Sequence, residues 1–145
     1  MAEEDILLIE RLLQALHDSK VDFTSFFREL SDISSQMPVK DISLRNNFID
    51  RAMIDEWFED YLERIKTETS SDIERSSLMK LVNPKFVLRN HLAQKAIEMA
   101  QQDNYSEIQK LMTILETPFD DQPQYEDYAK PPHPGENHIE VSCSS

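Results

Sequence analysis

The side chain of this sequence that is best suited to redox chemistry is the thiol of Cys143, the only cysteine among 145 residues. A thiol reacts as its thiolate, and neighbouring cations lower its pKa. The adjacent Ser142, Ser144 and Ser145 carry no charge, so activation would have to come from a partner surface. Two interpretations are open: an inert thiol in a loose tail, or an accessible thiol that pairs with another protein or domain. One cysteine excludes a disulfide within the chain and fits a cytoplasmic protein.

The other residue types that often perform catalysis or bind metals form no motif here. The histidines His17, His91, His133 and His138 are scattered, and the last two, five residues apart, would make a weak metal site. The single glycine, Gly135, excludes a glycine-rich phosphate loop. The serines include no nucleophile-elbow motif. We therefore expect no catalytic residue, no metal ligand and no cofactor-binding residue in this chain.

Arg89 places a charge on an apolar surface. Residues 84–102 show helical periodicity, with Asn83 as the predicted N-cap and Pro84 at the first helical position. At about 100° per residue, Arg89 lies inside an apolar arc that covers about half of this helix. Either the guanidinium extends to water from the end of the arc, or it is a buried structural or docking anchor with a carboxylate partner.

The elements that position these side chains are expected to be helices. Hairpin turns commonly use glycine, which occurs once, and the stretches of Leu, Ile, Glu, Lys, Gln and Met favour helix. The predicted fold class is all-α, a bundle of about five to six helices with an extended C-terminal tail. The third predicted helix has the broadest apolar face, opposite a run of carboxylates that indicates solvent exposure. The predicted helices span residues 5–19, 22–35, 45–66, 72–81, 84–102 and 106–117.

The composition changes at Pro118, which ends the last predicted helix. Five of the seven prolines lie in residues 118–145, which are acidic and end in Cys-Ser-Ser. We therefore expect a helical domain over residues 1–117 and an extended, proline-rich tail over residues 118–145. Scattered apolar side chains favour a tail that lies along a surface. These are Phe119, Tyr125, Tyr128, Ile139 and Val141.

The net charge of −13 argues against two classes of partner. Nucleic acids and anionic membranes both attract clustered Lys and Arg, which number 15 in this chain against 28 Asp and Glu. No apolar run approaches the roughly 18 residues of a membrane span. The acidic N-terminus is unlike a signal or transit peptide. We expect no nucleic-acid partner and no membrane partner.

Two segments of the chain resemble the C-terminal end of the SelO-type protein adenylyltransferases. One is NPKFVLRNHLAQ at residues 83–94, in which Arg89 and Asn90 match a motif of the family. The other is the tail, with PFD at 118–120, YAKPP at 128–132 and VSCSS at 141–145. Eukaryotic members carry selenocysteine at the position that matches Cys143. Residues 134–137 depart from the family pattern.

The resemblance implies a bacterial, cytoplasmic protein and a role within a longer enzyme. Family members have a kinase-like fold, bind ATP in a flipped orientation with Mg or Mn, and transfer AMP to Ser, Thr or Tyr of other proteins. Their nucleotide and metal ligands lie in the kinase-like part, and none of them can be carried onto this chain. The resemblance thus implies a C-terminal helical domain, inactive alone, whose partners are its own kinase-like domain and the protein substrates of the whole enzyme.

The resemblance also gives Cys143 a role. It matches a redox-active terminal residue that is thought to form a bridge to a cysteine of the kinase-like part and so to regulate activity. Arg89 and Asn90 gain no catalytic role and stay structural or docking candidates, together with Asn83. The alternative functional hypothesis is a free-standing acidic helical adaptor that binds partner proteins without enzymatic activity.

Overall fold

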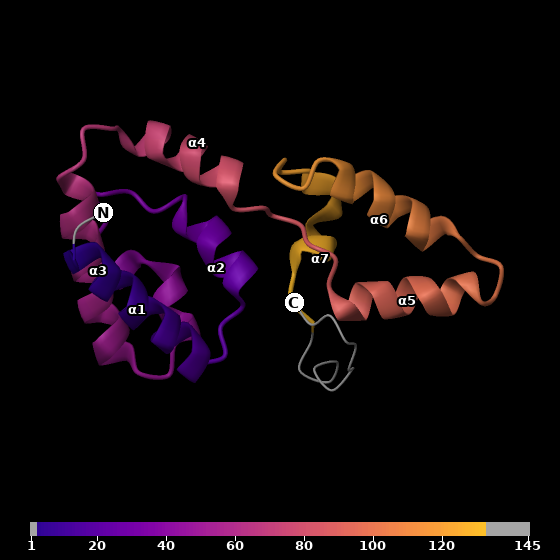
Figure 1. The fold of residues 1–145 in the computed structure, drawn as a ribbon, viewed down its shortest axis with the longest axis horizontal. Coiled ribbons are helices and arrows are strands. Elements are labelled where there is room, and N and C mark those ends of the chain that lie inside the picture. The colour runs from indigo at the N-terminus through magenta and orange to yellow at the C-terminus, as the bar shows by residue number, and fades with distance from the viewer. Residues whose placement is uncertain (1–2, 133–145) are drawn as a thin grey trace. The chain divides into compact units, whose positions relative to one another are not determined.

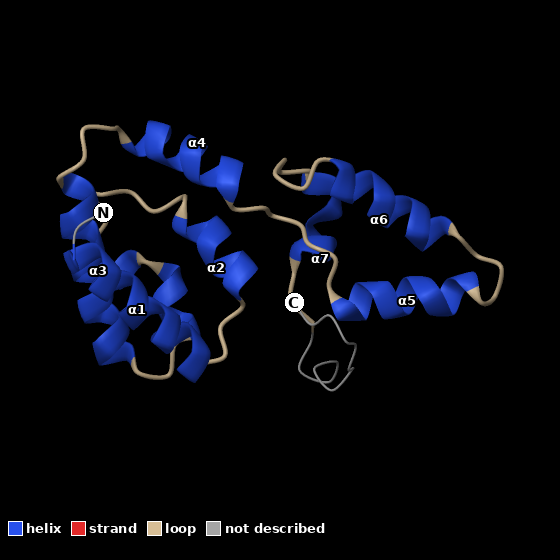
Figure 2. Ribbon diagram, viewed as in Figure 1, coloured by secondary structure: helices blue, strands red, loops and turns tan. Residues whose placement is uncertain are grey.

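The computed structural model describes residues 3–132, and within that range the regular elements are α-helices and short 3-10 turns, with no strand (Figure 2). The predicted all-α class is therefore confirmed. The chain divides into two compact units, residues 1–79 and residues 80–145. None of the helices within 3–132 is both long enough and apolar enough to cross a membrane. The α-helices are α1 (Glu3–Asp18), α2 (Phe23–Leu30), α3 (Arg51–Lys66), α4 (Asp72–Val82), α5 (Asn90–Ala100), α6 (Ser106–Glu116) and α7 (Glu126–Ala129) (Figure 1).

The core of the first unit forms where α1 packs against α3. Trp57 lies at its centre, with edge-on contacts to Phe26 and Phe58 and a stacked contact to Tyr61. Its indole Nε1 donates a hydrogen bond to the backbone carbonyl of Leu8, at 2.9 Å. The predicted broad apolar face of the third helix is therefore the face that builds this core.

Aspartate side chains set where α2 and α3 begin. Asp22 accepts a hydrogen bond at 2.9 Å from the backbone N–H three residues further on, so it is the cap of α2. Asp50 does the same for α3 at 3.1 Å. The predicted start of this helix at residue 45 is wrong, because residues 43–47 form a separate 3-10 turn that buries Leu44 in the core. Tertiary packing here overrides local helix propensity.

The predicted helix over residues 84–102 is shorter, since α5 begins at Asn90 and Asn83 caps no helix at residue 84. The backbone N–H groups of Lys85 and Phe86 both donate to the carbonyl of Pro118, at 3.0 and 3.2 Å. These bonds replace the helical ones, and they place Phe86 in the interior, 1 % exposed. Residues 83–89 therefore form a connection that pairs with chain beyond α6.

In the second unit α5 and α6 lie side by side (Figure 1). Ser106, where the last predicted helix begins, is the first helical residue of α6, and its N–H and hydroxyl both donate to the side chain of Asn104. The C-terminal end of α6 is closed by Gln122, whose side-chain amide donates to the carbonyls of Ile114 and Thr117. Both ends of α6 are thus capped by side chains from outside the helix.

The described start of the predicted tail, residues 118–132, is not simply extended. It contains a 3-10 turn, η3 (Pro123–Tyr125), followed by the short helix α7. Tyr125 and Tyr128, two of the predicted anchors, pack edge to face with their ring centres 5.9 Å apart. The boundary between helical domain and tail at residue 117 stays a prediction. Of the other predicted anchors, Phe119 is 41 % exposed, and Ile139 and Val141 lie outside the described residues.

Candidate functional site

The predicted docking residues Asn83, Arg89 and Asn90 lie along one segment of the second unit. Arg89 precedes α5 in extended conformation and is 3 % exposed, so the interpretation in which it extends to water is wrong. Its Nη2 donates a hydrogen bond to the backbone carbonyl of Ala129 at 3.2 Å. Asn90 opens α5, and Asn83 directly follows α4, both of them half-buried. Arg89 is therefore a buried anchor that ties the start of α5 to α7.

Lys85 makes a second tie between the same two stretches of chain. Its ammonium donates to the backbone carbonyl of Asp121 at 2.7 Å and pairs with the carboxylate of Glu126. It also lies 5.6 Å from the centre of the Phe86 ring. Sequence reasoning missed Lys85, because its partners are more than 30 positions away along the chain and no local spacing identifies them.

A buried carboxylate links α6 to α7. Glu107 accepts a hydrogen bond at 2.9 Å from the hydroxyl of Tyr128 and a weaker one at 3.4 Å from the ammonium of Lys110. Burial raises the pKa of Glu107, but these two hydrogen bonds and the charges of Lys110 and Lys95 outweigh it and hold the pKa below its usual value. Burial and the same hydrogen bond raise the pKa of Tyr128. Glu107 thus has a structural role, because it joins α6 to α7 through Tyr128.

We expect Arg89→Met to lower the free energy of unfolding of the second unit by roughly 1–3 kcal/mol, because it leaves the carbonyl of Ala129 without its donor. Lys130→Met is the matched control, since the pair of Lys130 with Asp127 is exposed and should contribute little. Chemical denaturation followed by circular dichroism measures both variants. Equal stability of the two variants would show that the buried hydrogen bond of Arg89 does not contribute to the free energy of unfolding.

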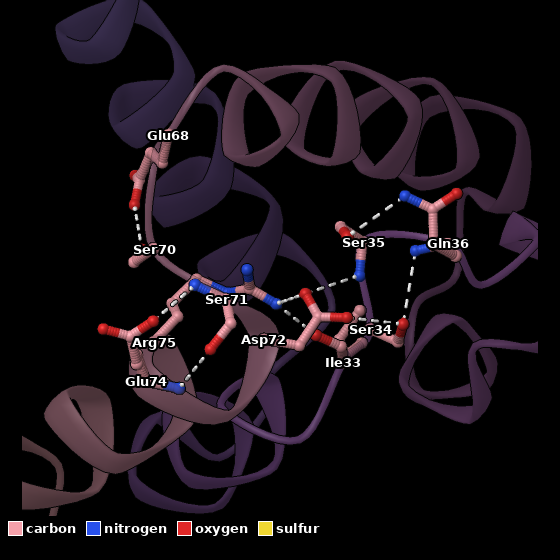
Figure 3. A network of polar contacts seen from close by, with 10 residues as sticks. All are labelled: Ile33, Ser34, Ser35, Gln36, Glu68, Ser70, Ser71, Asp72, Glu74 and Arg75. Atoms are coloured by element: carbon pink, nitrogen blue, oxygen red, sulfur yellow. Dashed lines mark hydrogen bonds and ion pairs between the residues drawn. The ribbon is translucent and has the colours of Figure 1, made fainter.

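The first unit holds a second polar cluster, centred on Arg75 in α4 (Figure 3). The guanidinium is buried, and its Nη2 donates to the carbonyl of Ile33 at 2.8 Å and to the carboxylate of Asp72 at 2.7 Å. Asp72 also accepts from the hydroxyl of Ser34 at 2.8 Å and from the backbone N–H of Ser35 at 3.1 Å. We call these five residues the Arg75 clamp. It fixes the start of α4 to the loop that follows α2.

The clamp also explains two local features of the sequence. The predicted end of the second helix near residue 35 is wrong, because Ser34 and Ser35 bond to α4 after α2 has ended at Leu30. The start of α4 was predicted at residue 72, and Ser71 and Glu74 form a reciprocal capping box there, with both hydrogen bonds at 3.1 Å. Only the long-range part of the clamp had no signal in the sequence.

Acid should weaken the clamp. The hydrogen bonds from Arg75, Ser34 and the backbone of Ser35 hold the pKa of Asp72 far below its usual value. A folded-state pKa below the unfolded one gives stability that is present above the unfolded value of about 3.9 and is lost as pH falls through the folded value. Thermal melts below about pH 4 should therefore show a shallower loss of stability for Asp72→Asn than for the wild type. Identical acid slopes would contradict this prediction.

The polar clusters around Arg75, Arg89 and Glu107 have a structural role. Their carboxylates and cations are bonded to each other or to backbone groups, which holds helix ends in place. Within residues 3–132, no group of three or more His, Cys, Asp or Glu side chains is arranged to hold a metal ion. Cys143, His133 and His138 lie outside the described residues. In the described part of the chain, these polar groups therefore serve to hold helices together.

Comparison with known proteins supplies the enzymatic context. The family model described as protein adenylyltransferase SelO matches residues 1–116. A protein nucleotidyltransferase YdiU from Cupriavidus metallidurans is 45 % identical over 99 % of this chain, which covers 26 % of that protein. The YdiU proteins of Cupriavidus pinatubonensis and Paraburkholderia xenovorans are 46 % and 44 % identical, and the chain covers 28 % and 27 % of them. The chain therefore spans about a quarter of the length of these curated relatives.

Proposed function

The chain belongs to the SelO family of protein adenylyltransferases, and from that premise we propose that it is a helical, non-catalytic part of such an enzyme. The observation that supports this proposal best is that the family model matches residues 1–116, although the chain spans only about a quarter of the length of its relatives. In this proposal the remaining three quarters contain a kinase-like domain. That domain binds ATP with Mg or Mn and transfers AMP to hydroxyl groups of protein substrates.

The contribution of this chain is to pack on the kinase-like domain and stabilise it. Two features support this role. The sequence has a single glycine, whereas loops that cradle phosphates need several. The ionisable groups Arg75, Arg89 and Glu107 are bonded to partners within the chain, which suits a scaffold. Asn83, Arg89 and Asn90 belong to this scaffold and touch no reacting group in the proposal.

Cys143 adds a regulatory role to the proposal. Its thiol forms a disulfide with a cysteine of the kinase-like domain, and the two thiols give up two protons and two electrons to a thiol oxidant such as another disulfide. The bond would hold the C-terminal end of the chain on that domain. Reduction would release it. AMP transfer by a family-length protein should then respond to the redox state of the buffer, and Cys143→Ala should remove that response.

The decisive experiment compares the 145-residue chain with a family-length protein that carries it. We expect the chain alone to show no ATP binding by calorimetry and no transfer of labelled AMP, whereas the family-length protein transfers AMP. The reason is that nothing in this chain supplies the phosphate-binding backbone that ATP requires. Micromolar ATP binding by the isolated chain would refute the assignment of a non-catalytic part.

A further inference from the structure

Helix α4 buries a charged side chain and exposes apolar ones, the reverse of the usual arrangement. A helix on the surface of a protein usually buries its apolar side and shows its charged side to water. In α4 the buried residue is Arg75, 7 % exposed, whereas four aliphatic side chains face solvent. These are Ile73, Leu78, Leu81 and Val82, which are 79, 63, 68 and 72 % exposed.

The four aliphatic residues form one continuous surface. At about 100° per residue, positions 73, 77 and 81 fall in one column along the helix, and positions 74, 78 and 82 fall in the adjacent column. Ser77 and Glu74 are the remaining members of the two columns. The carboxylate of Glu74 accepts the backbone N–H of Ser71 in the capping box, so it is turned toward the helix start. We call these two columns the apolar face of α4.

The Arg75 clamp determines that this face points away from the core of the first unit. Arg75 and Met79 lie one turn apart in the next column, opposite that of Ile73 and Leu81, and Met79 packs against that core. Turning the helix to bury the apolar face would break the bond of Arg75 to Ile33 and the bonds of Asp72 to Ser34 and Ser35 (Figure 3). It would also leave a buried carbonyl without a donor, which is costly. The sequence thus stabilises the orientation that keeps the apolar face open.

We propose that the apolar face of α4 docks into an apolar groove on the remaining three quarters of the family-length protein. This inference rests on the proposed function. The occupant follows from length: the chain spans about a quarter of its relatives, so a family-length protein brings some three times as much polypeptide into the same molecule. A covalently attached partner has a high effective concentration, which favours it over a second copy of the chain.

The chemistry of the face defines the groove. Four aliphatic side chains at helical spacing are the pattern of a helix that inserts into a hydrophobic groove. Glu74 is the only ionisable residue of the two columns, so the centre of the groove is apolar, without a required charge partner. The docking is therefore driven by the removal of aliphatic surface from water.

Hydroxyl-radical footprinting read by mass spectrometry tests the docking on natural side chains. The samples are the 145-residue chain and a family-length protein in which this chain replaces the matching segment of the Cupriavidus metallidurans relative. We expect oxidation of Leu78 and Leu81 to fall at least fivefold in the family-length protein. Leu7 in α1, 58 % exposed, is the internal reference for radical dose and should keep its reactivity. Equal oxidation of Leu78 and Leu81 in both samples would overturn the docking.

A pair of variants gives an independent measurement. Leu78→Gln with Leu81→Gln keeps good helix formers and removes the apolar groups, so the isolated chain should melt as the wild type does. In the family-length protein the same pair should lower the melting temperature and shorten the proteolytic half-life at least threefold. Leu7→Gln with Leu13→Gln on α1 is the matched control. An equal effect of the control pair would overturn the assignment to α4.

The remaining outcomes separate this inference from the proposed function. Protection of Leu78 and Leu81 that appears in the isolated chain only as its concentration rises would assign the face to a second copy and overturn the docking. If the family-length protein transfers AMP while Leu78 and Leu81 keep their reactivity toward hydroxyl radicals, the docking is overturned and the proposed function is kept. Protection of α4 in a family-length protein that transfers no AMP would support the docking and count against the proposed function.

Discussion

Replacing Trp57 with alanine should lower the free energy of unfolding of the first unit by about 3–5 kcal/mol, the range found for large aromatic residues in a packed core. Trp57 is 2 % exposed and contacts the rings of Phe26, Phe58 and Tyr61. The substitution removes these contacts and leaves a cavity that the surrounding side chains fill only in part. It also removes the indole hydrogen bond to the carbonyl of Leu8.

Trp57→Phe separates the two contributions. Phenylalanine keeps most of the ring volume but has no N–H, so we expect a loss of about 1–2 kcal/mol for the missing hydrogen bond and the smaller ring. Denaturation followed by far-ultraviolet circular dichroism suits both variants, because neither retains the tryptophan. A loss below about 1 kcal/mol for Trp57→Ala would mean that the contact between α1 and α3 does not depend on this ring.

Arg75→Met should lower the free energy of unfolding of the first unit by about 2–3 kcal/mol. Methionine fills a similar volume, but the carbonyl of Ile33 loses a charged donor in a buried position. Asp72 keeps its bonds to Ser34 and Ser35, so the start of α4 stays partly attached. The variant should also flatten the acid dependence assigned to Asp72, because Arg75 is the largest cause of its lowered pKa.

Lys66→Met is the control for the loss of a positive charge. Lys66 forms an exposed pair with Glu63 at 3.5 Å, and such pairs contribute little. We expect its stability to stay within about 0.5 kcal/mol of the wild type. A urea titration at neutral pH compares the two variants. If they were equally stable, the Arg75 clamp would be an ordinary surface contact and the orientation of α4 would need another cause.

Local patterns predicted those parts of the fold that local physics decides. The broad apolar face of the third predicted helix identified the buried face of α3, and the start of α4 was predicted at residue 72, where the structure has it. The burial of Arg89 was one of two interpretations of its place in the apolar arc, and the structure selects it. In each case neighbours within one or two helical turns carry the signal.

The errors arise where distant residues compete with helical hydrogen bonds. The segment that begins at Asn83 has a good cap, a proline and helical periodicity, but the carbonyl of Pro118 takes the N–H groups of Lys85 and Phe86. Arg89 donates to the carbonyl of Ala129, 40 positions further on, and the periodicity around Arg89 does not predict that bond. Partners some 30 to 40 positions apart leave no trace in a local pattern.

The candidate site also contains a part that local patterns predicted and a part that depends on distant residues. Asn83, Arg89 and Asn90 were chosen from one segment, and the structure gives that segment an anchoring role through Arg89. The long-range bonds of the Arg75 clamp could not be predicted from the sequence, because the pairing of Asp72 with Ser34 and Ser35 depends on how α2 ends. The proposed redox role of Cys143 concerns a residue outside the described range, and it depends on the experiment with the family-length protein.

The place of Trp57 in the first unit gives the molecule a built-in optical reporter. It is the only tryptophan in the chain, so fluorescence excited at the red edge of the absorption band comes from residues 1–79 alone. Far-ultraviolet circular dichroism reports helices of both units. If the two signals change at the same denaturant concentration, the units unfold as one cooperative system, and if they separate, each unit has its own transition. One unlabelled sample can therefore decide whether the second unit depends on the first for its stability.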